Sequence, residues 1–119
     1  MEKHRRADID RLRKFLDDLK DSKPKRTHLV NMTKVINLMS KIGFKEHKQP
    51  GSKRPFSHEL LNNCPNYTSG RFLMAEAHGK KDMMYWDNFE EHILDALEYV
   101  IDRIESENLI LEENENEQL

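Results

Sequence analysis

Residues 42–56, IGFKEHKQPGSKRPF, decide the fold of this chain. Turn-forming residues lie at the centre, where Pro50 fixes one backbone angle and Gly51 accepts the positive φ of a type II turn. The two flanking segments, residues 44–48 and 55–61, are therefore predicted to pair as the strands of a hairpin. Most charged side chains in this stretch are basic, so the hairpin is predicted to present a cationic surface.

Two helices are predicted upstream of the hairpin. Apolar residues recur at intervals of three and four over residues 5–20 and again from about Leu29 or Met32 to Ile42. Thr27 and Asn31 are both candidates to cap the start of the second helix. Gly43 fits the left-handed position just past its end.

A strand and a long helix are predicted downstream. The run from Arg71 to Ala77 is short, mostly apolar and bounded by glycines, which favours a strand over a helix. A final helix is predicted from Asp87 to about Ile104, because apolar residues follow the helical period over about five turns. Asp87 and Glu90 have the spacing of a capping box.

This order of elements predicts an α+β fold. An N-terminal helix with a basic connector (residues 1–28) precedes an α-β-β-β-α two-layer domain (residues 29–106) with a small antiparallel sheet. Helices are expected to cover one face of the sheet and to leave the other face open. The remaining residues, 107–119, are rich in glutamate and are predicted to form a disordered acidic tail.

Composition narrows the possible functions. No apolar run approaches the roughly 20 residues that span a bilayer, and the N-terminus is charged, so a cytoplasmic protein without membrane contact is expected. Cys64 is the single cysteine, which excludes an internal disulfide and any Cys-x-x-Cys site. The six histidines are scattered, and no nucleotide-binding glycine motif is present. We therefore predict no metal site and no cofactor.

Charge is distributed unevenly along the chain. Residues 19–54 hold ten Lys or Arg against two acidic residues, whereas residues 82–119 hold one arginine against thirteen acidic residues. A basic segment of this kind is typical of a surface that binds a polyanion, and the acidic segment is expected to solvate the chain, to repel like charges or to compete for that surface. Two ordinary solvated faces would give the same composition.

Three short motifs stand out together: Ile42-Gly43-Phe44, Gly51-Ser52-Lys53 and His78-Gly79-Lys80-Lys81-Asp82. Over roughly residues 30–104 their layout resembles that of the HicA toxins of bacterial toxin–antitoxin pairs. The resemblance implies a double-stranded-RNA-binding-like fold and a metal-independent endoribonuclease (mRNA interferase), with RNA as substrate and an antitoxin as protein partner. Family members usually carry Gly-Ser-His, and their histidine is implicated in cleavage. Lys53 stands in that place here.

Two histidines are candidates for acid–base catalysis. RNA cleavage without a metal needs a base for the 2′-hydroxyl and an acid for the leaving oxygen, and histidine titrates in the right range. His78 follows the third predicted strand, and His58 lies in the second. The alternative for each is an ordinary surface histidine.

A set of basic residues near the hairpin is the candidate RNA-binding cluster. Its cations would contact phosphates, and nearby aromatic residues are candidates to stack on bases. The candidate phosphate-binding residues are Lys45, Lys48, Lys53, Arg54, Lys80 and Lys81, and the candidate stacking residues are Tyr67, Phe72, Tyr85 and Trp86.

Two other functions remain open from the sequence. The first is a non-enzymatic protein-interaction module on the same scaffold, which would use the basic face or a surface formed by residues 83–86, MMYW. The second is an inhibitor whose acidic C-terminal helix imitates a nucleic-acid backbone.

Overall fold

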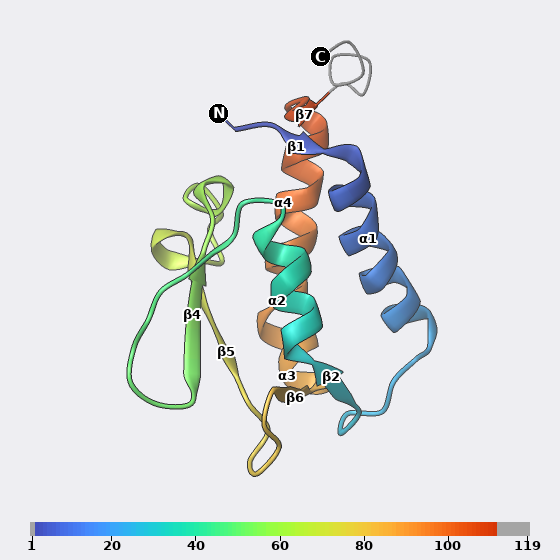
Figure 1. Ribbon diagram of the computed structural model, residues 1–119, viewed down its shortest axis with the longest axis vertical. Helices are drawn as coiled ribbons and strands as arrows, with labels where there is room; N and C mark the ends of the chain where they lie inside the picture. The colour runs from blue at the N-terminus through green and yellow to red at the C-terminus, as the bar shows by residue number, and fades with distance from the viewer. Residues whose placement is uncertain (1, 112–119) are drawn as a thin grey trace.

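The computed structural model describes residues 2–111, which form helices packed against small sheets (Figure 1). The elements in chain order are β1 (His4–Arg5), α1 (Arg6–Asp21), β2 (Leu29–Asn31), α2 (Met32–Ser40), β3 (Lys45–Glu46), β4 (Lys53–Ser57), η1 (Glu59–Leu61), η2 (Thr68–Gly70), β5 (Arg71–Ala75), β6 (Met83–Tyr85), α3 (Trp86–His92), α4 (Leu94–Ser106) and β7 (Ile110–Leu111). The predicted α+β class is confirmed.

Helices α1, α2 and α4 lie side by side, and the β3–β4–β5 sheet stands beside them (Figure 1). The apolar stripe of α1 enters the common core, where Ile9, Leu12 and Leu16 are at most 1% exposed. The N-terminal helix is therefore an integral part of the core. Within residues 2–111, no helix is both long and apolar enough to cross a bilayer.

The predicted hairpin forms as β3 and β4, and β5 pairs antiparallel on the other side of β4. Gly51 in the hairpin loop has the positive φ, 105°, that the Pro-Gly turn predicts. The second strand is shorter than predicted, because the chain turns into the 3₁₀ helix η1 at Glu59. Phe56, Phe72 and Met74 point to the helices and are buried.

Two further strand pairs, which the sequence pattern does not predict, join distant parts of the chain. Strand β2 pairs antiparallel with β6, so the MMYW segment is not an exposed surface: Met84 is 1% and Trp86 6% exposed. Strand β1 pairs parallel with β7, and Ile110 is buried. The predicted disordered tail is therefore wrong for residues 107–111. Residues 112–119 lie outside the described residues.

The helix predicted from Asp87 to Ile104 is two helices. Ile93 has a φ of −115°, outside the helical range, and separates α3 from α4. The predicted capping box is wrong, since α3 begins at Trp86 and the Asp87 carboxylate accepts a hydrogen bond from the neighbouring N–H of Asn88. At α2 the predicted cap is present, because the Asn31 side chain accepts from the Lys34 N–H at 3.1 Å.

We expect α1 to be essential for stability. Replacing the fully buried Leu12 with alanine leaves a cavity between helices and should lower the free energy of unfolding by about 2–5 kcal/mol. The matched control is Leu29→Ala, at a residue 37% exposed, which should change it by only about 0.5 kcal/mol. Urea denaturation followed by circular dichroism measures both. Equal losses would contradict the placement of α1 in the core.

Candidate functional site

The outer face of the β3–β4–β5 sheet, turned away from the helices, is cationic. Side chains alternate between the two faces of a strand, and the register places one set of residues on this side. No carboxylate belongs to this set, in strands that the structure describes completely. The outer-face residues are Lys45, His47, Lys53, Pro55, Ser57, Arg71, Leu73 and Ala75.

Three of the outer-face cations are free of ion pairs. Across residues 2–111, no carboxylate lies within ion-pair distance of Lys45, Lys53 or Arg71, and all three are exposed. Arg54 differs, because its side chain lies toward the other face and donates two hydrogen bonds of 2.7 Å to Glu46. These bonds hold the pKa of Glu46 below its ordinary value. Arg54 is thus occupied, although the sequence places it in the candidate phosphate-binding cluster.

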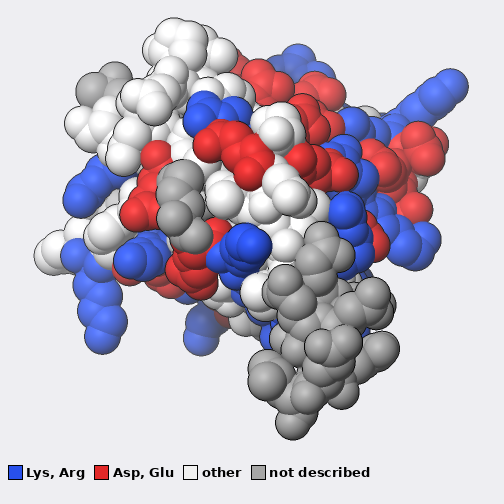
Figure 2. Space-filling model, turned by 90° about the horizontal axis from the view of Figure 1, so that it is seen from above, with Lys and Arg blue, Asp and Glu red and all other residues white. Residues whose placement is uncertain are grey.

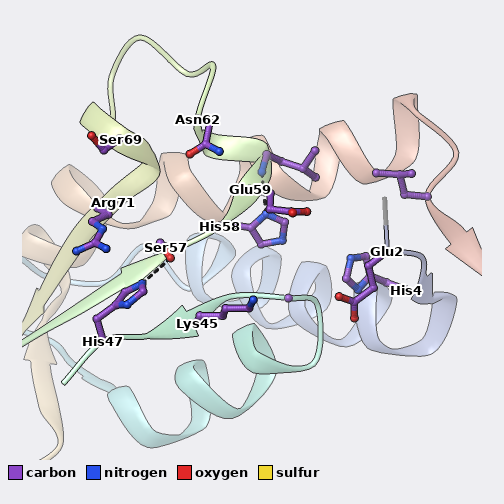
Figure 3. Close-up of a pocket in the computed structure, with 13 residues that line it drawn as sticks. Glu2, His4, Lys45, His47, Ser57, His58, Glu59, Asn62, Ser69 and Arg71 are labelled. Carbon is purple, nitrogen blue, oxygen red and sulfur yellow. Dashed lines mark hydrogen bonds between the residues drawn. The ribbon is translucent and has the colours of Figure 1, made fainter.

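A polar pocket of about 450 Å³, here called the histidine pocket, lies at the end of the outer face (Figure 3). Lys45, His47 and Arg71 line it from the sheet, and His4 and His58 line it from the other side. The only hydrogen bond drawn between two side chains there joins His47 Nε2 and Ser57 Oγ at 2.6 Å. Glu2 and Glu59 are also in the lining, so the pocket is not purely cationic.

His58 is held by backbone groups on both sides of its ring. Its Nε2 lies 2.8 Å from the carbonyl oxygen of Ile42, to which it donates, and its Nδ1 accepts from the N–H of Leu60 at 3.1 Å. This pattern fixes the neutral tautomer. Burial lowers the pKa of His58, against a raising effect of the bond to Ile42. Its ring therefore joins the end of α2 to η1, and neither nitrogen is free for proton transfer to a substrate.

His4 reaches the same place from β1. The centroids of the two imidazole rings, His4 and His58, are 6.3 Å apart. Burial lowers the pKa of His4, with smaller raising effects from Glu2 and Asp8. Gly43, which has a φ of 98°, lies against both rings, because a Cβ there would be 3.0 Å from His58 Nε2 and 3.1 Å from His4 Cε1. A glycine at this position allows the two rings to approach the chain.

The structure does not bring the two candidate catalytic histidines together. His58 follows β4 and lies beside the start of β5, because its backbone N–H donates to the carbonyl of Gly70. His78 is exposed in the turn after β5, and the strand between them is about 17 Å long at 3.4 Å per residue. No shared acid–base site exists between them.

The predicted cationic cluster is divided in the same way. Lys45 lies at the histidine pocket, whereas Lys48 is exposed in the loop between β3 and β4. Lys80 and Lys81 are exposed in the β5–β6 turn together with acidic residues: the backbone N–H of Asp82 donates to Glu76 there. That turn therefore carries charges of both signs.

None of the four aromatic residues proposed to stack on bases presents an open ring. Phe72 and Trp86 are buried, at 7% and 6% exposure. Tyr67 is half-buried, and its hydroxyl lies 3.5 Å from the carbonyl of His92. Tyr85 is half-buried in β6. The sheet therefore offers no aromatic platform.

The acidic helix α4 is paired with the basic residues of α1. Arg13 binds both Asp102 and Glu105, and Lys20 Nζ lies 2.6 Å from Glu98. Seen from above, acidic and basic side chains are interleaved rather than divided into two sides (Figure 2). The charge asymmetry of the sequence is thus partly neutralised by folding, which counts against α4 as a nucleic-acid mimic.

Sequence reasoning missed His4, His47 and Arg71 as parts of the site. The period of two in the hairpin was a usable signal for His47, because it places Lys45 and His47 on one face. For Arg71, the signal was its place at the start of a strand that pairs with β4. His4 had no local signal, because the β1–β7 pairing brings it to the pocket.

Comparison with known protein families, curated proteins and solved structures found no match to this chain. The resemblance to the HicA toxins therefore stays a prediction. Among residues 2–111, no three His, Cys, Asp or Glu side chains gather closely enough to hold a metal ion.

We expect acid to destabilise the fold through the two buried histidines. The folded protein keeps both rings neutral, whereas the unfolded chain protonates them near the ordinary pKa of 6.5. Unfolding then takes up protons, so the free energy of unfolding should fall as the pH drops below about 6.5 toward the lowered folded-state pKa values. Glu2, Asp8 and Glu59, the nearby carboxylates, reduce this loss without reversing it.

Urea denaturation between pH 7.5 and pH 5 measures the effect. The matched variant is His4→Phe, which keeps an aromatic ring and removes one titrating group, so its stability should depend less steeply on pH. A wild-type stability that stays constant over this range would show that the two rings do not resist protonation.

We also expect Gly43→Ala to cost more stability than Gly51→Ala. Both glycines have a positive φ near 100°, so alanine should be strained by about 1–3 kcal/mol at either position. Only at Gly43 would the new methyl group meet the two imidazole rings, whereas nothing lies within 4 Å at Gly51. The difference in unfolding free energy between the variants isolates this contact. No difference would mean that the rings can move away freely.

Proposed function

We propose that this protein binds RNA through the phosphate backbone, using the outer face of the β3–β4–β5 sheet. One observation carries the proposal: Lys45, Lys53 and Arg71 are exposed on that face without an ion pair in residues 2–111, while the nearby Glu46 is taken up by Arg54. Cations that the fold leaves unpaired on one surface attract a polyanion and release its counterions on binding.

The spacing of these cations suits an extended backbone rather than a single phosphate. Lys45 and Arg71 lie opposite Ser57 on either side of β4, so their Cα atoms are about 10 Å apart at two strand spacings. Lys53 lies four residues along β4 from Ser57, about 13 Å away. The three positive charges thus form a triangle over the sheet.

Recognition by shape rather than by base stacking follows from the buried aromatic residues. Proteins that read single-stranded RNA stack bases on exposed rings, whereas proteins that bind RNA duplexes contact phosphates and 2′-hydroxyls. The outer face holds lysine, arginine, histidine and serine beside Pro55, Leu73 and Ala75, and the ring of His47, its one aromatic ring among the described residues, is half-buried. A duplex is therefore the form of RNA that this face suits best.

The resemblance to the HicA toxins supports RNA as the polyanion. Apart from the short strand β6 between β5 and α3, the order α2, β3, β4, β5 and then a helical segment resembles that of the double-stranded-RNA-binding-like fold. Binding is favoured over cleavage, because the ring of His58 is held by Ile42 and Leu60 and His78 lies at the other end of β5. A relative of a ribonuclease that keeps the binding surface without the cleavage site fits these features.

We expect an RNA duplex of about 16 base pairs to bind with a strong dependence on salt. Lys45→Ala and Arg71→Ala should each weaken binding and each reduce the log–log salt slope by about 0.7–0.9, the effect of one lost phosphate contact. Fluorescence anisotropy at several salt concentrations measures both quantities, and a gel in EDTA checks that the RNA stays intact.

The control variant is Lys25→Ala, which removes an equal charge from the exposed connector between α1 and β2. Its affinity and salt slope should match those of the wild type. If all three variants weaken binding equally, the attraction is a property of the net charge and not of the sheet. Cleavage of the RNA in the presence of EDTA would instead show that the protein is a metal-independent ribonuclease.

A further inference from the structure

Strand β5 is an open edge of the three-stranded sheet. The strand order is β3-β4-β5, so the only neighbour of β5 in the described part of the chain is β4. Leu73, at the centre of β5, is 46% exposed, the largest exposure of any large apolar side chain among the described residues. An edge of this kind, with an apolar residue at its centre, is a template for another strand.

The register shows which backbone groups of β5 are free. The N–H of His47 donates to the carbonyl of Pro55 at 2.9 Å, so the backbone of Pro55 points to the β3 side. Proline also has no N–H to give to β5. Leu73, which lies opposite Pro55, therefore directs its own N–H and carbonyl away from β4, to the open side.

The hydrogen bonds of the neighbouring residues agree with the outward direction of the Leu73 backbone groups. The N–H of His58 donates to the carbonyl of Gly70, so the even-numbered residues of β4 and β5 bond to each other. Arg71, Leu73 and Ala75 alternate with them and face outward. Three residues of β5 thus offer backbone donors and acceptors to an incoming chain.

A groove of about 560 Å³ follows this edge. Phe72, Leu73 and Met84 supply apolar surface, and Lys53 and Arg71 supply positive charge. Among residues 2–111, no acidic side chain lines the groove. Its chemistry is complementary to an extended peptide that carries both apolar and acidic side chains.

We propose that a partner protein adds a β-strand to the Arg71–Ala75 edge, with three apolar residues in a row and an acidic residue at each end of them. Residues of the added strand opposite Arg71 and Ala75 share the outer face with Arg71 and Lys53, so acidic side chains suit both positions. The residue between them covers Leu73 and is apolar. The two intervening residues face Phe72 and Met84 in the groove and are also apolar.

Charge favours such a partner over a second copy of this chain. Antiparallel pairing of two β5 strands about Leu73 would place Leu73 opposite its own copy and join two cationic outer faces into one. Arg71 and Lys53 of both copies would then repel without a counter-charge. An acidic strand removes this repulsion.

A synthetic peptide tests the proposal directly. The probe is fluorescently labelled acetyl-Ser-Glu-Ile-Val-Ile-Glu-Ser-amide, and anisotropy measures its binding to the full chain. We expect Leu73→Pro to weaken binding by about tenfold, because it removes the outward N–H at a position that gives no hydrogen bond to β4. Leu73→Thr keeps this N–H and should bind within about twofold of the wild type.

Further comparisons keep the test decisive. If Leu73→Pro fails to fold by circular dichroism, Leu73→Asp keeps the backbone donor, repels the acidic peptide and should also weaken binding. A peptide with both glutamates replaced by lysine, or with a methylated central amide, should bind at least about tenfold more weakly than the probe. If these altered peptides bind as tightly as the probe, the proposal is wrong. It is also wrong if the wild-type chain forms a dimer and Leu73→Pro dissociates that dimer, because the edge would then bind a second copy.

The experiment is independent of the RNA-binding proposal. Lys45 does not line the groove, so Lys45→Ala should leave peptide binding unchanged while it weakens RNA binding. Leu73→Pro should affect the peptide far more than the RNA. A negative result for peptide binding would therefore not contradict the RNA-binding proposal, and a negative result for RNA binding would not contradict the strand proposal.

Discussion

The alternation of side chains across the β3–β4–β5 sheet is the constraint on which this structure depends. Each residue of an extended strand points to the face opposite that of its neighbours, so Phe56, Phe72 and Met74 enter the core only if the residues between them point outward. The residues that alternate with the buried set along β4 and β5 include Lys53, Ser57 and Arg71. Burial of the aromatic side therefore creates the cationic side, and a slip of one residue would exchange the two.

A second constraint acts where the β1–β7 pair meets the hairpin. The β1–β7 pair brings His4 to the end of α2, and Gly43 leaves room there for the rings of His4 and His58. The ring of His58 is hydrogen-bonded both to the carbonyl of Ile42, just after α2, and to the N–H of Leu60 in η1. Two neutral imidazoles thus connect three segments, which makes this junction sensitive to acid and explains why His58 serves packing more than catalysis.

Folding also separates the charges that are neutralised from those that remain available. The acidic residues of α4 meet arginine and lysine of α1, and Glu46 meets Arg54. Lys45, Lys53 and Arg71 keep no carboxylate partner within residues 2–111. Lys53 and Arg71 line the groove at the free edge of β5, whereas Lys45 lies on β3 at the other side of the sheet. The face proposed to bind RNA and the edge proposed to bind a strand therefore adjoin each other, with Arg71 at their boundary.

Local features were predictable because they depend on neighbouring residues. The apolar period of α1 and α2, the Asn31 cap, the Pro50-Gly51 turn and the strand at Arg71–Ala75 follow from patterns a few residues long. The prediction at Asp87 failed because α3 begins one residue earlier, at Trp86, and Tyr85 holds the N-cap position without a side-chain hydrogen bond.

The tertiary structure decided what depends on residues far apart in the chain. Pairing of β2 with β6 buried Met84, the bend at Ile93 divided the last helix, and the β1–β7 pair placed His4 next to His58. The ion pair with Glu46 removed Arg54 from the free cations, although the sequence shows the two residues only as neighbours across a turn. Composition therefore determined that the hairpin is basic, while strand register and long-range packing determined which of its charges face a ligand.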